Sequence, residues 1–414
     1  KHLFNKGGSS EALRGEDSPL KCRFLEEMPV SKLKIMLSAT EVSGDLHASN
    51  LVKAIKRIHP SADFVGIGGE RMQEAGVDVR AFTTHMGTIG LLEGVKFYPS
   101  FLRIKSMAEE ILRKERPDLV VLIDSRDFNL RIIRLAKKFK IPTVYYVAPP
   151  VWAWPDWEAK NIARSVDRVI AIFPFEVELY EKLGAKVTFV GHPLLDLAKP
   201  EMKKEQAYRK FDLNPVKPII GLLPGSREQE INRLLPVMLK AAHILKENLK
   251  EAQFLLPVAA SVFRDKIARM LKRSTVPIKM TDNSVYEIMT ISSLLITASG
   301  TATLEAACLN APMIILYKTS ISTYLLGKIL LKIPYVGLPN ILAQRRIVPE
   351  LLQFKATPKR VADLALKMLA DSRRLKRMRD ELKEVAGKLG RPGAIDRAAR
   401  AVLETAGLYK RGKR

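Results

Sequence analysis

The chain has 414 residues, of which 47% are hydrophobic and 27% charged, a composition that is typical of a folded globular protein and excludes a disordered chain. Because a single hydrophobic core stops growing beyond about 250–300 residues, we expect two domains, and the two cysteines, Cys22 and Cys308, exclude a disulfide framework and fit a reducing cytoplasm. The formal net charge of +25 leaves nucleic acid, an anionic membrane surface, phosphorylated substrates and a solvated basic surface open as explanations.

Residues 1–31 are polar and predict a flexible N-terminal extension, with neither a signal peptide nor a transmembrane stretch in the chain. Short apolar runs then alternate with helical patterns. Strands are expected at 34–39, 64–69, 77–82, 118–123, 143–147 and 168–173, and helices at 46–58, at 71–75 and from about 130 to 140. This alternation predicts a parallel, doubly wound sheet. In such sheets the ligand lies at the carboxyl ends of the strands, so the loops at 40–45, 124–129 and 148–154 should share one edge.

One segment, residues 88–104, departs from the alternation. Its apolar side chains lie close together between Lys96, Arg103 and Lys105, and they include Leu91, Leu92, Val95, Phe97, Phe101 and Leu102. An apolar face edged by basic residues is typical of a segment that contacts lipid. The pattern fits a core helix equally well.

The second half repeats the alternation, with strands expected at 219–223, 253–257, 278–280, 294–297 and 313–317. The first of them turns through Pro224, Gly225 and Ser226 into a helix that runs from Arg227 to Asn248. A strand that turns through glycine into a helix directs free amides and a positive dipole end at one point, which suits a phosphate, although an ordinary strand-to-helix connection looks the same.

A second turn of this kind follows at Ser299, Gly300 and Thr301, and two such turns favour a nucleotide diphosphate site. Glu305, one helical turn further on, could hold ribose hydroxyls or complement the helix dipole. Neither a Walker lysine nor a dinucleotide fingerprint is present, which disfavours ATP hydrolysis and redox chemistry and leaves transfer from a nucleotide sugar.

The predicted fold class is therefore α/β, with two doubly wound, Rossmann-like domains facing a cleft. After the extension at 1–31, we expect one α/β domain at 32–198 and a second, nucleotide-binding α/β domain at 199–392. Residues 393–414 should form a helix that returns to the first domain, followed by a basic tail.

At this point the chain resembles the lipid-A-disaccharide synthase family of inverting, two-domain (GT-B type) glycosyltransferases. The resemblance keeps order and spacing from about residue 34 to about residue 407. The matching pieces are Glu41–Asp45, Gly90–Glu93, Ile123–Asn129, Val151–Trp154, Phe173–Glu176, Gly191–Pro193, Leu223–Arg227, Ala298–Ala302 with Glu305, Tyr317–Lys318, Leu338–Asn340 and Pro349–Gln353.

The resemblance implies transfer of diacylglucosamine from UDP-2,3-diacylglucosamine to 2,3-diacylglucosamine 1-phosphate, forming a β-1,6-linked disaccharide 1-phosphate and UDP in lipid A biosynthesis. It implies an enzyme that uses neither a metal nor a cofactor and binds no nucleic acid. The enzyme would be cytoplasmic and bound peripherally to the anionic inner membrane, and a homodimer is left open. Asp127 would be the base and Glu41 would lie near the reacting centre, while Asp124 is either a second essential carboxylate or, as we favour, a helix cap. The implied donor-binding residues are Gly225, Ser226, Arg227, Ser299, Gly300, Thr301, Glu305, Tyr317 and Asn340.

Three positions depart from the family pattern: Thr40 replaces a usual Gly, Arg126 a usual Pro or small residue, and Gln344 a usual Gly. Another enzyme acting on UDP-N-acetylglucosamine, either a transferase or an epimerase, stays open as an alternative, and the charge alone motivates a nucleic-acid-binding protein.

Overall fold

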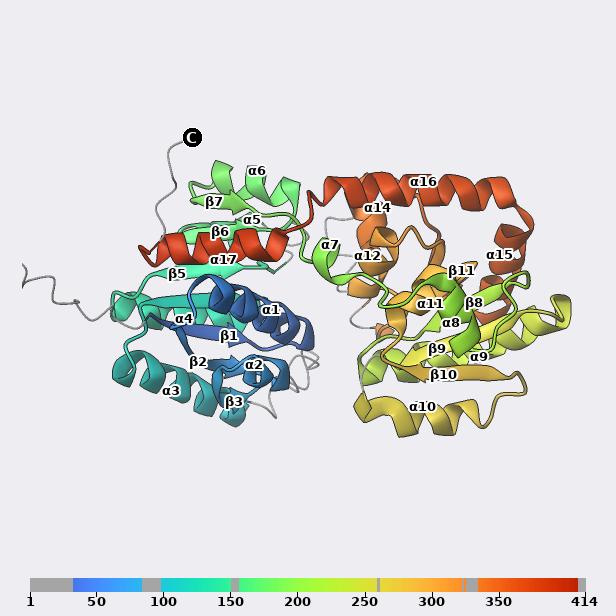
Figure 1. Ribbon diagram of the computed structural model, residues 1–414, viewed down its shortest axis with the longest axis horizontal. Helices are drawn as coiled ribbons and strands as arrows, with labels where there is room; N and C mark the ends of the chain where they lie inside the picture. Colours follow the sequence, from blue (N-terminus) through green and yellow to red (C-terminus); the bar gives the residue numbers. More distant parts are fainter. Residues whose placement is uncertain are drawn as a thin grey trace, which may run out of the picture.

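The computed structural model describes residues 33–83, 98–149, 156–258, 261–321, 324 and 334–408. Two lobes lie side by side, each built on its own parallel sheet (Figure 1). The first lobe has a seven-stranded sheet in the order β3-β2-β1-β4-β5-β6-β7, and the second a six-stranded sheet in the order β10-β9-β8-β11-β12-β13. The α/β fold class predicted from the sequence is confirmed.

The inner strands of the first sheet, β2, β1, β4, β5 and β6, are short runs buried on both faces, as expected when helices cover both sides of a parallel sheet, whereas the edge strands β3 and β7 are partly exposed. All of its neighbouring pairs are parallel. The strands are β1 (Lys34–Ala39), β2 (Asp63–Gly68), β3 (Asp78–Phe82), β4 (Leu119–Ile123), β5 (Thr143–Tyr146), β6 (Arg168–Ala171) and β7 (Val187–Phe189).

The helices of the first lobe are α1 (Val42–Ile58), α2 (Glu70–Glu74), α3 (Tyr98–Lys114), α4 (Arg126–Lys138), α5 (Asp156–Ala163), α6 (Pro174–Lys182) and α7 (Leu194–Leu197). The start expected for the first helix, Leu46, is wrong, because α1 already begins at Val42. Ser43, Gly44 and Asp45 therefore form its first turn, where an acidic residue complements the helix dipole.

The second sheet contains β8 (Ile219–Leu223), β9 (Gln253–Val258), β10 (Ile278–Asp282), β11 (Leu294–Ala298), β12 (Met313–Tyr317) and β13 (Glu350–Leu352). Its core strands β8, β11 and most of β12 are fully buried. The helices around it are α8 (Lys204–Lys210), α9 (Glu228–Asn248), α10 (Arg264–Leu271), α11 (Val285–Ile291), α12 (Thr301–Cys308), α14 (Leu338–Ala343), α15 (Pro358–Ala370) and α16 (Ser372–Lys388), with short 3-10 turns at Ser261–Phe263 and Gln353–Lys355.

The last helix, α17 (Ala394–Thr405), returns to the first lobe and packs on α1 (Figure 1). A buried ion pair of 2.9 Å joins Arg168 on β6 to Glu404 on α17. Asp196 accepts hydrogen bonds from the amides of Gly393 and Ile395, the latter at 3.0 Å, and so caps the start of α17. The chain therefore crosses between the lobes twice, and both crossings are anchored on the first lobe.

Residues 88–104, for which the sequence left a lipid-facing and a core interpretation open, lie largely outside the described residues. The structure describes neither Leu91, Leu92, Val95 and Phe97 nor the side chain of Phe101. Where α3 is described, Ile104, Ala108, Ile111 and Leu112 are buried against the sheet, whereas Leu102 is 44% exposed. Among the helices of the described residues, none combines the length and apolarity needed to cross a membrane.

Candidate functional site

The carboxyl edges of the two sheets approach each other at one point. In the first sheet β1 and β4 are neighbours with Ala39 opposite Ile123, and in the second β8 and β11 are neighbours. Glu41 follows β1 and Arg227 follows β8, and their side chains form an ion pair of 3.0 Å from one lobe to the other. The loops expected at 40–45 and 224–227 are therefore brought together, whereas residues 150–154 of the third expected loop lie outside the described part of the chain.

Asp124, directly after β4, has an unusual backbone conformation. Its φ is 52° and that of Ser125 is 23°, values that favour glycine. The buried amide of Asn129 donates to the carbonyls of Ile123 and Asp124, both at 3.0 Å, and the Tyr145 hydroxyl also donates to the Asp124 carbonyl. These two residues, whose role the sequence did not reveal, hold the strained turn in place.

The interpretation of Asp124 as a helix cap is wrong. The N-cap of α4 is Ser125, which makes no side-chain cap bond, and the Asp124 carboxyl points instead toward the start of α1. There Oδ1 accepts a long hydrogen bond of 3.5 Å from the Thr40 amide, while Oδ2 is buried with no hydrogen-bond partner. Only a glycine at 44 leaves room for it, since a Cβ there would lie 1.7 Å from Oδ2.

Burial, followed by the charge of Glu41, raises the pKa of the Asp124 carboxyl well above its ordinary value, and the amides of Thr40, Glu41 and Gly44 offset only part of this. A buried carboxyl with an unused oxygen and a raised pKa at a strand end is suited to exchanging a proton with a ligand. Asp127, in the first turn of α4, has an exposed side chain.

Asp45, the last residue of the matched piece at 41–45, is structural. Its carboxylate accepts the amides of Gly69, Arg71 and Met72 at 2.9, 3.1 and 3.0 Å and so caps α2. A buried carboxylate with three amide donors is satisfied, so Asp45 is not available to a ligand, and Glu41, Asp124 and Asp127 are the other acidic groups near this edge.

The start of α9 differs from the expected phosphate loop. The amides of Ser226 and Arg227 already donate to Glu230 Oε2, at 3.1 and 3.3 Å. Gly225, with φ 110°, lets this carboxylate approach, since a Cβ at that position would lie 2.2 Å from Oε2. The chain's own carboxylate therefore takes the amides that the sequence assigned to a ligand, and the Arg227 side chain remains as the cationic group.

The start of α12 is open. Gly300 and Thr301 are exposed, and a Cβ added at Gly300 would meet nothing within 4 Å. Ser299 bonds to the carbonyl of Val336 at 3.0 Å, and Glu305 accepts a hydrogen bond of 3.1 Å from the Tyr286 hydroxyl. Burial raises the pKa of Glu305. This helix start follows β11, the strand next to β8 after which Arg227 lies, and its exposed backbone suits an anion.

Two further donor-site candidates lie deeper. Tyr317 ends β12 and is half-buried. Asn340 is fully buried, and its amide donates to Val348 and Glu350 while its oxygen accepts from the amides of Ile347 and Val348. All four hydrogen-bonding positions of Asn340 are thus used inside the protein.

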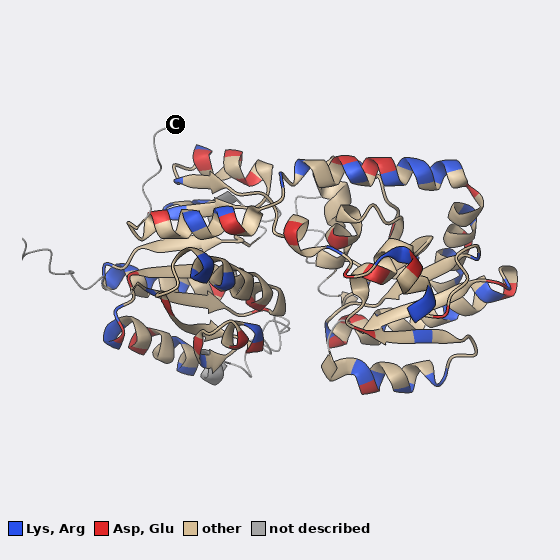
Figure 2. Cartoon of the chain, viewed as in Figure 1, with Lys and Arg blue, Asp and Glu red and all other residues tan. Residues whose placement is uncertain are grey.

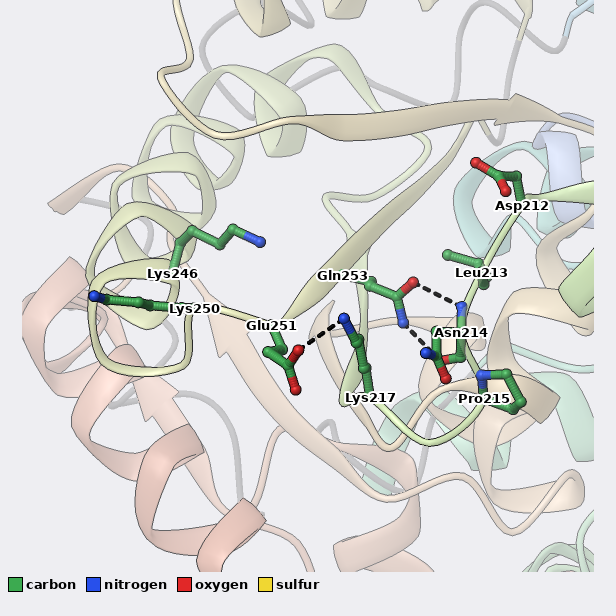
Figure 3. Close-up of a pocket in the computed structure, with 9 residues that line it drawn as sticks. All are labelled: Asp212, Leu213, Asn214, Pro215, Lys217, Lys246, Lys250, Glu251 and Gln253. Atoms are coloured by element: carbon green, nitrogen blue, oxygen red, sulfur yellow. Dashed lines mark hydrogen bonds and ion pairs between the residues drawn. The ribbon is translucent and has the colours of Figure 1, made fainter.

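A hollow on the second lobe lies at the other edge of the sheet, where β8 and β9 begin (Figure 3). Its polar groups pair with one another: Gln253 exchanges two hydrogen bonds with the backbone of Asn214, at 2.9 and 2.8 Å, and Lys217 pairs with Glu251 at 2.7 Å. We therefore do not assign the ligand there. No group of three or more His, Cys, Asp or Glu side chains in the described part of the chain is placed to hold a metal ion.

Comparison with known proteins decides the family. The model of the lipid-A-disaccharide synthetase family matches residues 35–404. The chain belongs to this family. Lipid-A-disaccharide synthases of Geobacter sulfurreducens and Syntrophus aciditrophicus are 40% and 41% identical to it over 374 and 370 residues. These matches cover 90% and 89% of this chain and 97% and 96% of the relatives.

Solved structures support the fold of the family in this chain. The UDP-GlcNAc 2-epimerase of Neisseria meningitidis matches with a TM-score of 0.60 and 13% identity, covering 90% of this chain and 98% of the other. A glycosyltransferase of Rickettsia africae matches with a TM-score of 0.51 and 14% identity, covering 91% and 99%. At such low sequence identity these structural matches are evidence for the fold alone. The function is therefore inferred from the family match and not from the similarity to the epimerase.

Proposed function

We propose that this chain transfers 2,3-diacylglucosamine from UDP-2,3-diacylglucosamine to the 6-hydroxyl of 2,3-diacylglucosamine 1-phosphate, releasing UDP. The observation that carries the proposal is the family match over residues 35–404, together with relatives about 40% identical along nearly their whole length. The two-lobed fold supports it, because one sheet edge presents carboxylates and the other presents Arg227.

On the acceptor side we assign the base to Asp124. Its unpartnered, buried Oδ2 can accept the proton of the 6-hydroxyl while the hydroxyl oxygen forms a bond to the anomeric carbon of the donor. The raised pKa makes the ionised carboxyl a stronger base. Asp127, the base predicted from the family resemblance, is the second residue of α4 and is exposed. Comparing Asp124→Asn with Asp127→Asn tests which of the two carboxylates is the base.

On the donor side the bond from the anomeric carbon to the diphosphate breaks, and UDP leaves with the electron pair. Arg227 and the start of α12 would stabilise the negative charge that develops on the diphosphate. Attack from the face opposite UDP inverts the anomeric centre and gives the β linkage, and the proposed mechanism uses no metal ion.

The proposal is tested with purified protein, UDP-2,3-diacylglucosamine and diacylglucosamine 1-phosphate in mixed micelles, by measuring UDP release and disaccharide formation. We expect both products in equal amounts. UDP-N-acetylglucosamine, offered with and without the lipid acceptor, is the matched control. Turnover of that soluble sugar with no turnover of the acylated donor would contradict the proposal and support the epimerase or another transferase.

We also propose that the chain works at the surface of the anionic inner membrane, because both substrates carry acyl chains and phosphate. Lys and Arg positions are spread over both lobes in the cartoon of Figure 2, among many acidic positions. Leu102 is an exposed apolar residue at the start of α3. The double variant Leu92→Asp, Phe101→Asp should lose binding to vesicles of phosphatidylglycerol and phosphatidylethanolamine, and retained binding would place this segment in the core.

A further inference from the structure

Arg227 has two acidic neighbours in this structure. Glu41 Oε2, from the other lobe, lies 3.0 Å from Nη2, and Glu230 Oε1, one turn along α9, lies 4.0 Å from Nη1. The mechanism uses the Arg227 guanidinium to bind the diphosphate. The guanidinium is therefore already engaged by the chain itself before any phosphate reaches it.

The two carboxylates are held very differently. Glu230 is fixed, because its other oxygen accepts the amides of Ser226 and Arg227 within the same helix turn. Glu41 has no comparable anchor: it is the N-cap residue of α1, yet its side chain makes no cap bond there. Its side chain is 34% exposed and that of Arg227 is 50% exposed.

An ion pair with this much exposure contributes on the order of 1 kcal/mol or less. A diphosphate presents several charged oxygens to the guanidinium fork and binds it more strongly than one carboxylate does. Glu41 is consequently the partner that a phosphate can displace, whereas Glu230 stays in place.

We infer that Glu41 competes with the diphosphate of a uridine nucleotide for Arg227, and thereby weakens UDP binding and promotes UDP release after transfer. This inference rests on the proposed function. When the diphosphate binds, the ion pair between Glu41 and Arg227 breaks, and it forms again when UDP leaves. The residue thus sets the affinity of the donor half although it belongs to the acceptor lobe.

The test is a double-variant cycle of UDP affinity, measured by titration calorimetry on wild type, Glu41→Gln, Arg227→Gln and the double variant. Glu41→Gln should bind UDP about five-fold more tightly, since UDP no longer displaces a carboxylate. In the Arg227→Gln background the same change should have no effect. The matched control is Glu228→Gln, which removes an acid next to Arg227 whose partner is Lys266 at 2.6 Å, and it should leave UDP affinity unchanged.

An unchanged or weaker UDP affinity of Glu41→Gln overturns the inference, because a purely structural role lowers affinity when the residue is changed. An equal gain in the Arg227→Gln background or in Glu228→Gln also overturns it, since the effect would then be one of general charge. In both cases wild-type binding of UDP leaves the proposed function standing. If wild type binds no UDP, the proposed function and the inference fall together.

Discussion

Gly44 gives the sharpest test of the acceptor site, since a single methyl group there collides with the carboxyl assigned as the base. In Gly44→Ala the new Cβ would lie 1.7 Å from Asp124 Oδ2 and 2.6 Å from its Cγ, and real Cβ contacts are essentially never under 3.0 Å. The carboxyl therefore has to move by more than about 1 Å. A displacement of that size at a reacting group costs roughly 100-fold in rate, or about 2.7 kcal/mol of activation free energy.

The loss should appear in turnover rather than in folding. Overpacking costs about 1–3 kcal/mol of stability, and alanine in place of a helical glycine returns about 0.5–1 kcal/mol. We expect the variant to fold, to bind UDP on the second lobe with wild-type affinity, and to lose about 100-fold in kcat in the disaccharide assay.

Gly387→Ala is the matched control, because Gly387 is also helical and a Cβ there meets nothing within 4 Å. It should keep full activity and gain slightly in stability. Turnover of Gly44→Ala within about three-fold of wild type, in a folded protein, would refute the assignment of Asp124 as the base.

Three further predictions concern the same assays and the stability of each lobe. Asp124→Asn should abolish turnover while UDP binding survives, and Asp127→Asn should retain more activity than Asp124→Asn; the reverse order would return the role of base to Asp127. Burial lowers the pKa of His47 from 6.5 to about 4. As the pH falls, His47 therefore takes up a proton in the unfolded chain before it does so in the folded protein. The free energy of unfolding should consequently drop by about 2 kcal/mol between about pH 7 and pH 5. Urea denaturation at a series of pH values should show a smaller drop in His47→Phe than in wild type. An equal pH dependence of the free energy of unfolding in the two proteins would contradict this prediction. Asn340→Ala removes four internal hydrogen bonds and should cost about 3 kcal/mol of stability, whereas a ten-fold loss of UDP affinity at unchanged stability would instead show a direct donor contact.

The sequence by itself determined most of the strands and the order in which they alternate with helices, but it did not predict the short edge strands β7 and β13. The continuous apolar runs at 118–123 and 294–297 are typical of strands buried on both faces, and their alternation with helical patterns predicts parallel sheets. The ends of the apolar runs also predicted loops at 40–45, 124–129, 224–227 and 299–301. Because each of these loops follows a strand, the sequence confined the candidate site to a few loops. Those predictions depend on short-range patterns that the chain itself displays.

The partners of each carboxylate were decided only by the tertiary structure. Asp45, Glu41 and Asp124 look alike in the sequence, yet Asp45 caps a helix 25 or more residues away, Glu41 reaches Arg227 in the other lobe, and Asp124 is left with an unpartnered oxygen. A motif predicts which groups are present at a strand end. Whether a group is satisfied depends on amides and cations that are distant in sequence, and only the packing of the two sheets brings these together.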